Sequence, residues 1–177
     1  MAATQLDQSS HAIALFESAY ARMLLGDAPA VKDLIARALM APDRQAGYGE
    51  NAWSARNASP IGSSYRIDRA VAELALGDQL SAQRDLDAVL GMLNAMIAAG
   101  VERSGTYELR AKVYALKGQG DDAMRDLSQA AKLGWRRAWW ATHEPYLVSL
   151  QSRSDFQALI SHVNESNIRI APRIDSN

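Results

Sequence analysis

Residues 111–130, AKVYALKGQGDDAMRDLSQA, decide the fold of this 177-residue chain. On both sides of Gly118, apolar residues recur at intervals of three and four, which is the spacing of one face of an amphipathic helix. Glycine commonly ends helices because it adopts positive backbone φ angles without steric cost. The stretch therefore predicts two helices joined by a tight turn at Gly118.

The same pattern of residues occurs earlier in the chain. Gly77 lies 41 residues before Gly118, and residues 84–86 and 125–127 both read Arg-Asp-Leu. A third copy of the turn, Leu-Gly-Asp at residues 25–27, places its glycine 51 residues before Gly77. Internal self-similarity of this kind is typical of stacked helix pairs, because one pair cannot bury its own apolar face. We therefore expect an all-α fold built from helix pairs.

Six positions of the 111–130 stretch resemble the tetratricopeptide repeat family, in which small and aromatic residues lie on the first helix, glycine closes the turn, and small, large and small residues pack the second. These positions are Ala111, Tyr114, Gly118, Ala123, Leu127 and Ala130. In the two earlier copies, Glu73 and Arg22 take the place of the aromatic. The resemblance implies an α-solenoid of about three helix pairs, with Arg125 and Asp126 on the outer side.

Turn residues divide the chain into three repeat-like units of one predicted domain that covers residues 1–177. These units lie at about 11–42, 64–99 and 104–134, a capping segment covers 135–170, and a long connection rich in glycine and small polar residues covers 43–63. The clearest predicted helices are Tyr65–Leu76, Leu80–Ala99, Thr106–Lys117, Asp121–Leu133 and Asp155–Glu165.

The C-terminal residues resemble a closing segment that follows tetratricopeptide-like repeats in bacterial signalling proteins, including winged-helix regulators and adenylate-cyclase-like proteins. The motifs that carry this resemblance are Gly-Trp-Arg-Arg at 134–137, Ala-Trp-Trp at 138–140, Glu-Pro at 144–145 and Asp-Phe-Gln-Ala-Leu-Ile at 155–160. The resemblance implies a regulatory module whose effector domain lies outside these 177 residues.

The aromatic residues of this segment have two interpretations. Trp135 and Trp139 are four residues apart, so on one helix they would share a face and seal the exposed end of the last repeat. Alternatively, the same pair together with Trp140, Tyr146 and Phe156 forms an aromatic cage or a partner-facing hot spot. We expect the sealing role.

Composition limits the function classes. The 19 Lys and Arg and the 20 Asp and Glu give a formal net charge of −1, which argues against a dedicated nucleic-acid binder. Without cysteine there is no disulfide and no thiolate ligand. The apolar stretch at 88–101 is shorter than the roughly 20 residues that a membrane span needs. We expect a cytoplasmic protein, or a periplasmic one if the sequence belongs to a longer membrane-anchored chain.

Catalytic motifs are missing from the sequence. His11, His143 and His162 are scattered, so they form none of the paired arrangements that bind zinc. The two glycines in residues 47–52 lack the third glycine and the preceding strand of a nucleotide-binding loop. We therefore expect no enzyme activity, no cofactor and no metal.

The predicted function is protein–protein interaction, with a partner peptide or helix bound in the groove that the first helix of each pair lines in such repeats. By the resemblance, the groove positions are Ile13, Phe16, Tyr20 and Met23 in the first unit, Ser64, Ile67 and Val71 in the second, and Glu108 and Lys112 in the third.

The long connection supports an alternative function. Tyr48 and Trp53 are large aromatic residues in a segment otherwise rich in glycine and small polar residues. Long connections in compact domains are often functional. The alternative is a small-ligand sensor domain of a transcriptional regulator, in which these two aromatics line a pocket with the first helix.

Overall fold

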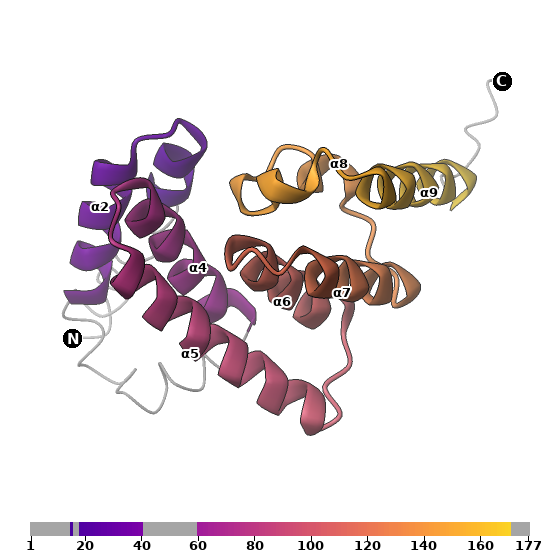
Figure 1. Ribbon diagram of the computed structural model, residues 1–177, viewed down its shortest axis with the longest axis horizontal. Coiled ribbons are helices and arrows are strands. Elements are labelled where there is room, and N and C mark those ends of the chain that lie inside the picture. The colour runs from indigo at the N-terminus through magenta and orange to yellow at the C-terminus, as the bar shows by residue number, and fades with distance from the viewer. Residues whose placement is uncertain (1–14, 16–17, 41–59, 171–177) are drawn as a thin grey trace, which may run out of the picture. The chain divides into compact units, whose positions relative to one another are not determined.

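The computed structural model describes residue 15, residues 18–40 and residues 60–170, in which all regular secondary structure is helical (Figure 1). The chain divides into two compact units, residues 1–101 and 102–177, which we describe separately. The all-α prediction is thus confirmed over the described residues. None of the helices in these residues has the length and apolar character needed to cross a bilayer.

The N-terminal unit contains a short helical stretch at residues 18–24 and the helices α2 (Ala28–Met40), α4 (Pro60–Ala75) and α5 (Gln79–Ala98). Helix α4 packs against both α2 and α5. The core of the N-terminal unit is a set of aliphatic side chains that are almost completely buried: Ala19, Val31, Ile35, Ile67, Ala70, Ala82, Leu86, Val89 and Leu93.

The turn between α4 and α5 is closed by Gly77, whose φ of +79° is unfavourable for residues with a Cβ. The Gly77 N–H donates to the Leu74 carbonyl at 3.1 Å, and the Asp78 N–H donates to the Glu73 carbonyl at 2.8 Å. These two bonds form the Schellman motif that satisfies the last carbonyls of a helix. The Asp78 carboxylate then caps α5 by accepting from the Ser81 N–H at 3.2 Å.

The C-terminal unit contains α6 (Ser104–Leu116), α7 (Gly120–Lys132), α8 (Ala138–Ala141), the 3-10 helix η2 (Pro145–Leu150) and α9 (Ser154–Ile170). Helices α6 and α7 form a second hairpin, and Gly118 closes its turn at φ +74° with the same pattern of bonds as at Gly77. The remaining helices belong to the same packed unit, because η2 lies against α6, and α9 contacts both α7 and α8.

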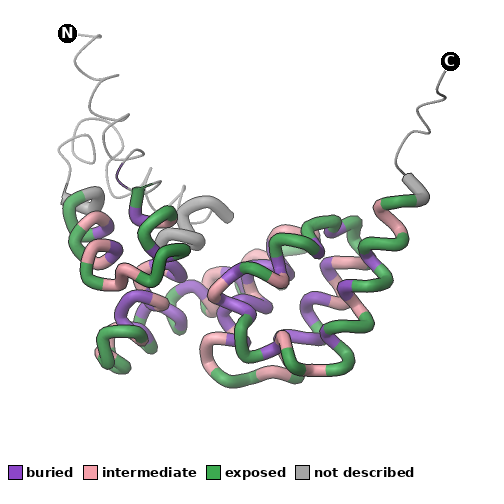
Figure 2. Tube along the Cα trace, turned by 90° about the horizontal axis from the view of Figure 1, so that it is seen from above, coloured by how far each residue is buried: buried purple, intermediate pink, exposed green. Residues whose placement is uncertain are grey.

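The two hairpins bury equivalent positions. Ala70, Ala82, Leu86 and Val89 of the first lie 41 residues before Ala111, Ala123, Leu127 and Ala130 of the second, and all eight are at most 2% exposed. Figure 2 shows buried residues recurring between exposed ones along these helices. The repeat that the sequence predicts is therefore a repeat of core positions in the structure.

Two predicted boundaries are wrong. Helix α4 begins at Pro60, so the connection predicted over 43–63 ends before that residue. Proline is favoured in the first turn of a helix, where its missing N–H has no intrahelical partner, and the small residues that follow it suggested a loop. Helix α9 extends to Ile170, beyond the predicted end at Glu165.

The predicted arrangement of the tryptophans is also wrong. Trp135 is buried, but it precedes α8, which begins at Ala138. Trp139 is 60% exposed and Trp140 is 44% exposed. Trp135 therefore joins the core of the C-terminal unit, whereas Trp139 does not seal that core with it.

Candidate functional site

Each hairpin is held by one buried arginine–aspartate bridge. Arg110 of α6 donates from Nε to Asp126 Oδ2 at 2.6 Å and from Nη2 to Asp126 Oδ1 at 2.8 Å. Arg69 of α4 makes the same bidentate contact with Asp85, with both distances at 2.5 Å. Asp126 was predicted on the outer side of the repeat, but it is buried because it pairs with Arg110 across the hairpin.

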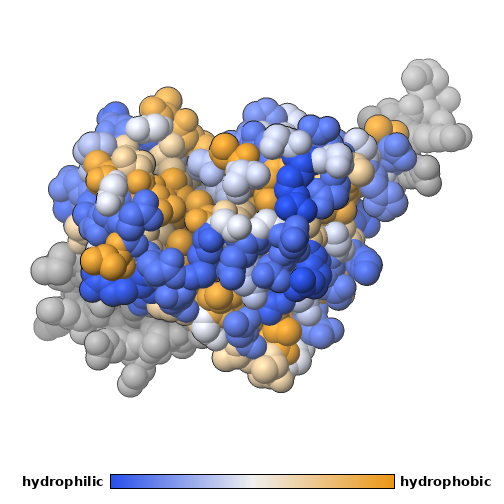
Figure 3. Space-filling view, viewed as in Figure 1, coloured by the Kyte–Doolittle hydropathy of each residue, from blue (hydrophilic) through white to orange (hydrophobic). Residues whose placement is uncertain are grey.

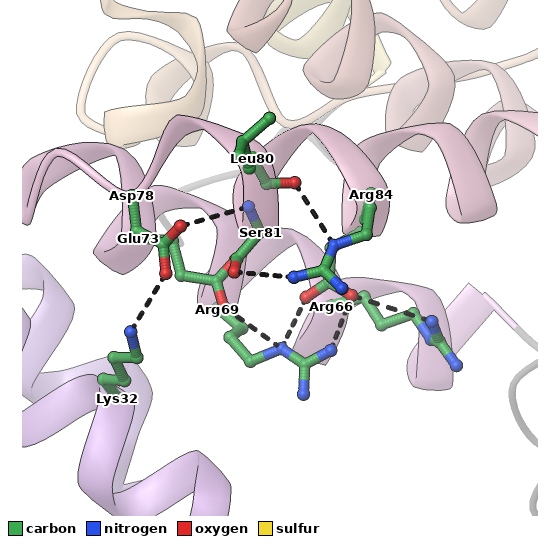
Figure 4. Close-up of polar contacts among 9 residues, drawn as sticks. Lys32, Arg66, Arg69, Glu73, Asp78, Leu80, Ser81 and Arg84 are labelled. Carbon is green, nitrogen blue, oxygen red and sulfur yellow. Dashed lines mark hydrogen bonds and ion pairs between the residues drawn. The ribbon is translucent and has the colours of Figure 1, made fainter.

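A larger polar cluster surrounds the Arg69–Asp85 bridge in the N-terminal unit (Figure 4). Arg66 approaches Asp85 to 3.7 Å, and Arg69 lies 3.8 Å from Glu73 Oε1. The other carboxylate oxygen of Glu73, Oε2, is buried and accepts no hydrogen bond. Burial raises the pKa of Glu73, and the neighbouring Asp85 charge raises it further.

This polar cluster provides poor chemistry for a reaction. A carboxyl group with a raised pKa suits general acid–base catalysis, but it must reach the reacting atom. The side chain of Glu73 is only 7% exposed. The Ser81 hydroxyl accepts a hydrogen bond from Arg84 at 3.0 Å, and the carboxylate beside it, Asp78, already caps α5 and accepts from Lys32 (Figure 4). The contacts of this cluster therefore join α4 to α5 and leave little accessible polar chemistry.

A second charged cluster docks the C-terminal segment onto α6. Lys112 Nζ lies 2.8 Å from Glu144 and 3.3 Å from Glu108, and all three side chains are buried. Its ammonium group also lies 4.9 Å from the centre of the Tyr146 ring, within the range of a cation–π contact. Arg137 approaches both glutamates to 3.7 Å from the solvent side. Two cations thus balance two carboxylates where η2 meets α6.

The predicted groove residues have different environments. Tyr20 and Val71 are half-buried in the N-terminal unit, whereas Met23 and Ile67 of the same unit are buried. Glu108 and Lys112 are buried in the C-terminal unit and bind Glu144. Burial prevents Met23, Ile67, Glu108 and Lys112 from meeting a partner in this conformation, so the predicted groove is corrected at these positions. The remaining predicted residues, Ile13, Phe16, Tyr48 and Trp53, lie outside the described residues, as does the side chain of Ser64.

The sequence analysis missed four exposed leucines beside the turns of the N-terminal unit. These turn leucines are Leu24, Leu25, Leu76 and Leu80. Leu25 is 77% exposed and Leu80 is 80% exposed, and Figure 3 shows hydrophobic side chains among hydrophilic ones on the visible face of this unit. Leu25 and Leu76 occupy equivalent positions, each preceding the glycine of its turn. The recurrence of leucine directly before the turn glycine was the available signal for Leu25 and Leu76.

A second exposed apolar group lies on the C-terminal unit. Trp139 and Trp140 of α8 meet edge to face, with ring centres 5.0 Å apart and planes at 82°. The His143 ring stacks on Trp139 at 4.4 Å. We call these three residues the aromatic patch. The sequence allows both a partner-facing hot spot and a sealing role for these tryptophans, and the exposure of Trp139 excludes the sealing role for that residue.

Comparison with known proteins finds no matching family, no matching curated protein and no matching solved structure. Among the described residues, no group of three His, Asp or Glu side chains is arranged to hold a metal ion. The site must therefore be interpreted from its own residues.

Proposed function

We propose that this chain is a non-catalytic protein-interaction module, built as an α-solenoid of tetratricopeptide-like helix pairs and belonging to a larger regulatory system. The recurrence of the same buried positions and of the same arginine–aspartate bridge in two hairpins supports the repeat. Repeats of this kind use their cores for stacking and leave an extended surface for partners.

The observation that carries the proposal is how polar and apolar side chains are distributed. The buried residues Asp85, Asp126, Lys112 and Glu144 pair with side chains of opposite charge, whereas several large apolar side chains are exposed. A catalytic site needs accessible polar groups of suitable pKa. A protein-binding surface needs accessible apolar and aromatic groups. The described residues fit the second requirement better.

The partner surface that we propose lies on the N-terminal unit. On α6, the groove positions Glu108 and Lys112 are already occupied by the chain's own C-terminal segment through Glu144. In the N-terminal unit, Tyr20 and Val71 are partly accessible and the turn leucines are exposed. A peptide or helix with apolar anchors would bury these side chains, and burial of apolar area would supply most of its affinity.

Site-specific photo-crosslinking in the native host tests this function. We would place a benzophenone amino acid at Leu25 or at Leu80, and as a control at Gln157, an exposed polar position on α9 of the C-terminal unit. The proposal predicts one protein adduct of defined mass at the leucine positions, which is strongly reduced at Gln157. Leu25→Ser combined with the probe at Leu80 should reduce the yield of this adduct.

Two results would count against the function. One is the absence of any protein adduct at Leu25 and Leu80 when the chain is expressed at its native level. The other is the same set of adducts at all three positions, which indicates random collision.

A further inference from the structure

Two neighbouring tryptophans of α8 are exposed. Tryptophan carries the largest apolar side chain, so a tryptophan left exposed gains little free energy from folding and can gain it when a partner covers the ring. In the C-terminal unit, Trp135 and Phe156 are buried, whereas the neighbouring Trp139 and Trp140 are 60% and 44% exposed. The core of this unit therefore accepts one tryptophan of this segment and leaves a pair of them outside.

The aromatic patch is held rigidly. The Thr142 hydroxyl donates to the Trp139 carbonyl at 2.8 Å, and Gln151 donates from Nε2 to the Thr142 carbonyl at 3.0 Å. On the other side of α8, Asn167 of α9 donates from Nδ2 to the Arg136 carbonyl at 3.0 Å. The backbone on both sides of the patch is thus tied to Gln151, which follows η2, and to α9. A surface fixed in this way loses little conformational entropy when it binds.

The exposed charges that flank the patch in the sequence are positive. Lys132 and Arg136 are exposed cations within residues 132–144, and Arg137 pairs with Glu108 and Glu144. Glu144 is the one acid in that range, and it is buried against Lys112. The patch and its flanks therefore present apolar rings next to positive charge, which is complementary to a partner that combines apolar and acidic residues.

From these observations we propose that the aromatic patch is a docking surface for an acidic peptide segment of a partner protein, anchored by an aliphatic side chain. Trp139 and Trp140 would receive the anchor, and the exposed cations Lys132 and Arg136, which are close in the sequence, would attract the acidic residues. This site is separate from the turn leucines and does not depend on the function proposed for them.

The ring geometry favours a peptide over a nucleic acid or a membrane. Single-stranded nucleic acids bind by stacking successive bases on several open ring faces, whereas His143 covers one face of Trp139. The planes of the tryptophans at 82° form a corner, which suits a compact aliphatic side chain. Helices that lie on a membrane need a long apolar face, and α8 has only 4 residues.

Fluorescence anisotropy with the full-length chain tests the proposal. The probes are three fluorescein-labelled peptides: one with acidic residues around two leucines, one with these leucines replaced by serine, and one with the acids replaced by lysine. We expect the acidic leucine peptide to bind most tightly, with an affinity that falls as salt is added. Each of the other two peptides should bind about tenfold more weakly, equivalent to about 1.4 kcal/mol.

Variants locate the binding. Trp139→Ala combined with Trp140→Ala should weaken binding of the acidic leucine peptide at least about tenfold. The melting temperature should fall only slightly, because Trp139 is 60% exposed and Trp140 is 44% exposed. Arg136→Ala should weaken binding and reduce its salt dependence. The matched control Leu25→Ala combined with Leu80→Ala removes two exposed apolar side chains of the other unit and should not change binding.

Several outcomes would overturn the inference: no binding of the acidic leucine peptide, equal binding of the lysine peptide, or full binding by the double tryptophan variant. Stronger binding of phosphatidylserine vesicles or of oligothymidine through the same tryptophans would also refute it. Because crosslinking at Leu25 and Leu80 uses other residues, failure of the peptide experiment leaves the proposed function standing, and failure of crosslinking leaves this inference standing.

Discussion

At the scale of single residues, the arginine–aspartate bridges show how charge is used in this molecule. Asp126 is buried, and Arg110 binds both of its oxygens. A carboxylate in such a place needs its partner, because an unpaired buried charge is strongly unfavourable. The recurrence of Arg-Asp-Leu is visible in the sequence. The pairing of its aspartate with an arginine 16 positions earlier is not, because it depends on how the two helices of the hairpin pack.

We therefore expect Asp126→Asn to lower the free energy of unfolding by about 3 kcal/mol, because it removes the charge that Arg110 requires. The matched control is Asp122→Asn, which breaks the exposed pair with Arg125 on the same helix. That change should cost less than about 1 kcal/mol. Urea unfolding followed by circular dichroism measures both. Equal effects of the two substitutions would contradict the structural role of the bridge.

Glu73 gives a pH prediction. Its pKa is raised in the folded protein, mainly by burial, above its ordinary value of 4.5. Between these two pKa values the folded state binds more protons than the unfolded state, so the contribution of Glu73 to stability falls as pH rises through this window.

Glu73→Gln removes that dependence, and it should stabilise the chain at neutral pH by about 1 kcal/mol. Below the ordinary pKa, where the native glutamate is protonated as well, the difference should shrink. Thermal melting of both proteins at acid and at neutral pH measures this difference in stability. A variant that is less stable than the native chain at neutral pH would indicate that the Glu73 charge is needed by Arg69.

At the scale of elements, the predicted hairpins agree closely with the structure. The predicted helices Thr106–Lys117 and Asp121–Leu133 correspond to Ser104–Leu116 and Gly120–Lys132. This agreement arises because periodic apolar residues and a glycine turn are both local signals. Contacts between distant segments give no local signal. The binding of Glu144 to Lys112 and the exposure of Trp139 depend on how the C-terminal segment packs, so the sequence could not predict them.

Glycine substitutions test the hairpin turns. Gly118 has a φ of +74°, so Gly118→Ala should lower stability by about 1 kcal/mol although no atom stands within 4 Å of the new Cβ. The control is Gly91→Ala, which lies within α5 at an ordinary φ with equally open space. That change should raise stability by about 0.5–1 kcal/mol. The urea concentration at half unfolding measures both variants. A shift in the same direction for Gly118→Ala and Gly91→Ala would contradict this turn geometry.

At the scale of the whole molecule, the C-terminal segment completes the second unit. It buries Tyr146, Leu147, Leu150 and Phe156 and supplies Glu144 to Lys112. Truncation after Leu133 should therefore expose apolar surface on α6 and α7 and cause aggregation or loss of cooperative melting. Size-exclusion chromatography and calorimetry measure this. A monomeric shortened chain with an unchanged melting temperature would mean that the segment is not part of the folded unit.

We propose that the arginine–aspartate bridges hold the hairpins, whereas exposed apolar residues carry the function. A substitution scan of the full chain in the native host tests it most directly, by measuring for each variant both protein abundance and the phenotype that loss of the chain produces. We predict that substitutions of Leu25, Leu80 and Trp139 impair the phenotype at normal abundance, and that substitutions of Asp85 and Asp126 reduce abundance and phenotype together. Loss of the phenotype at normal abundance in the aspartate variants, with the apolar positions tolerant, would contradict the account.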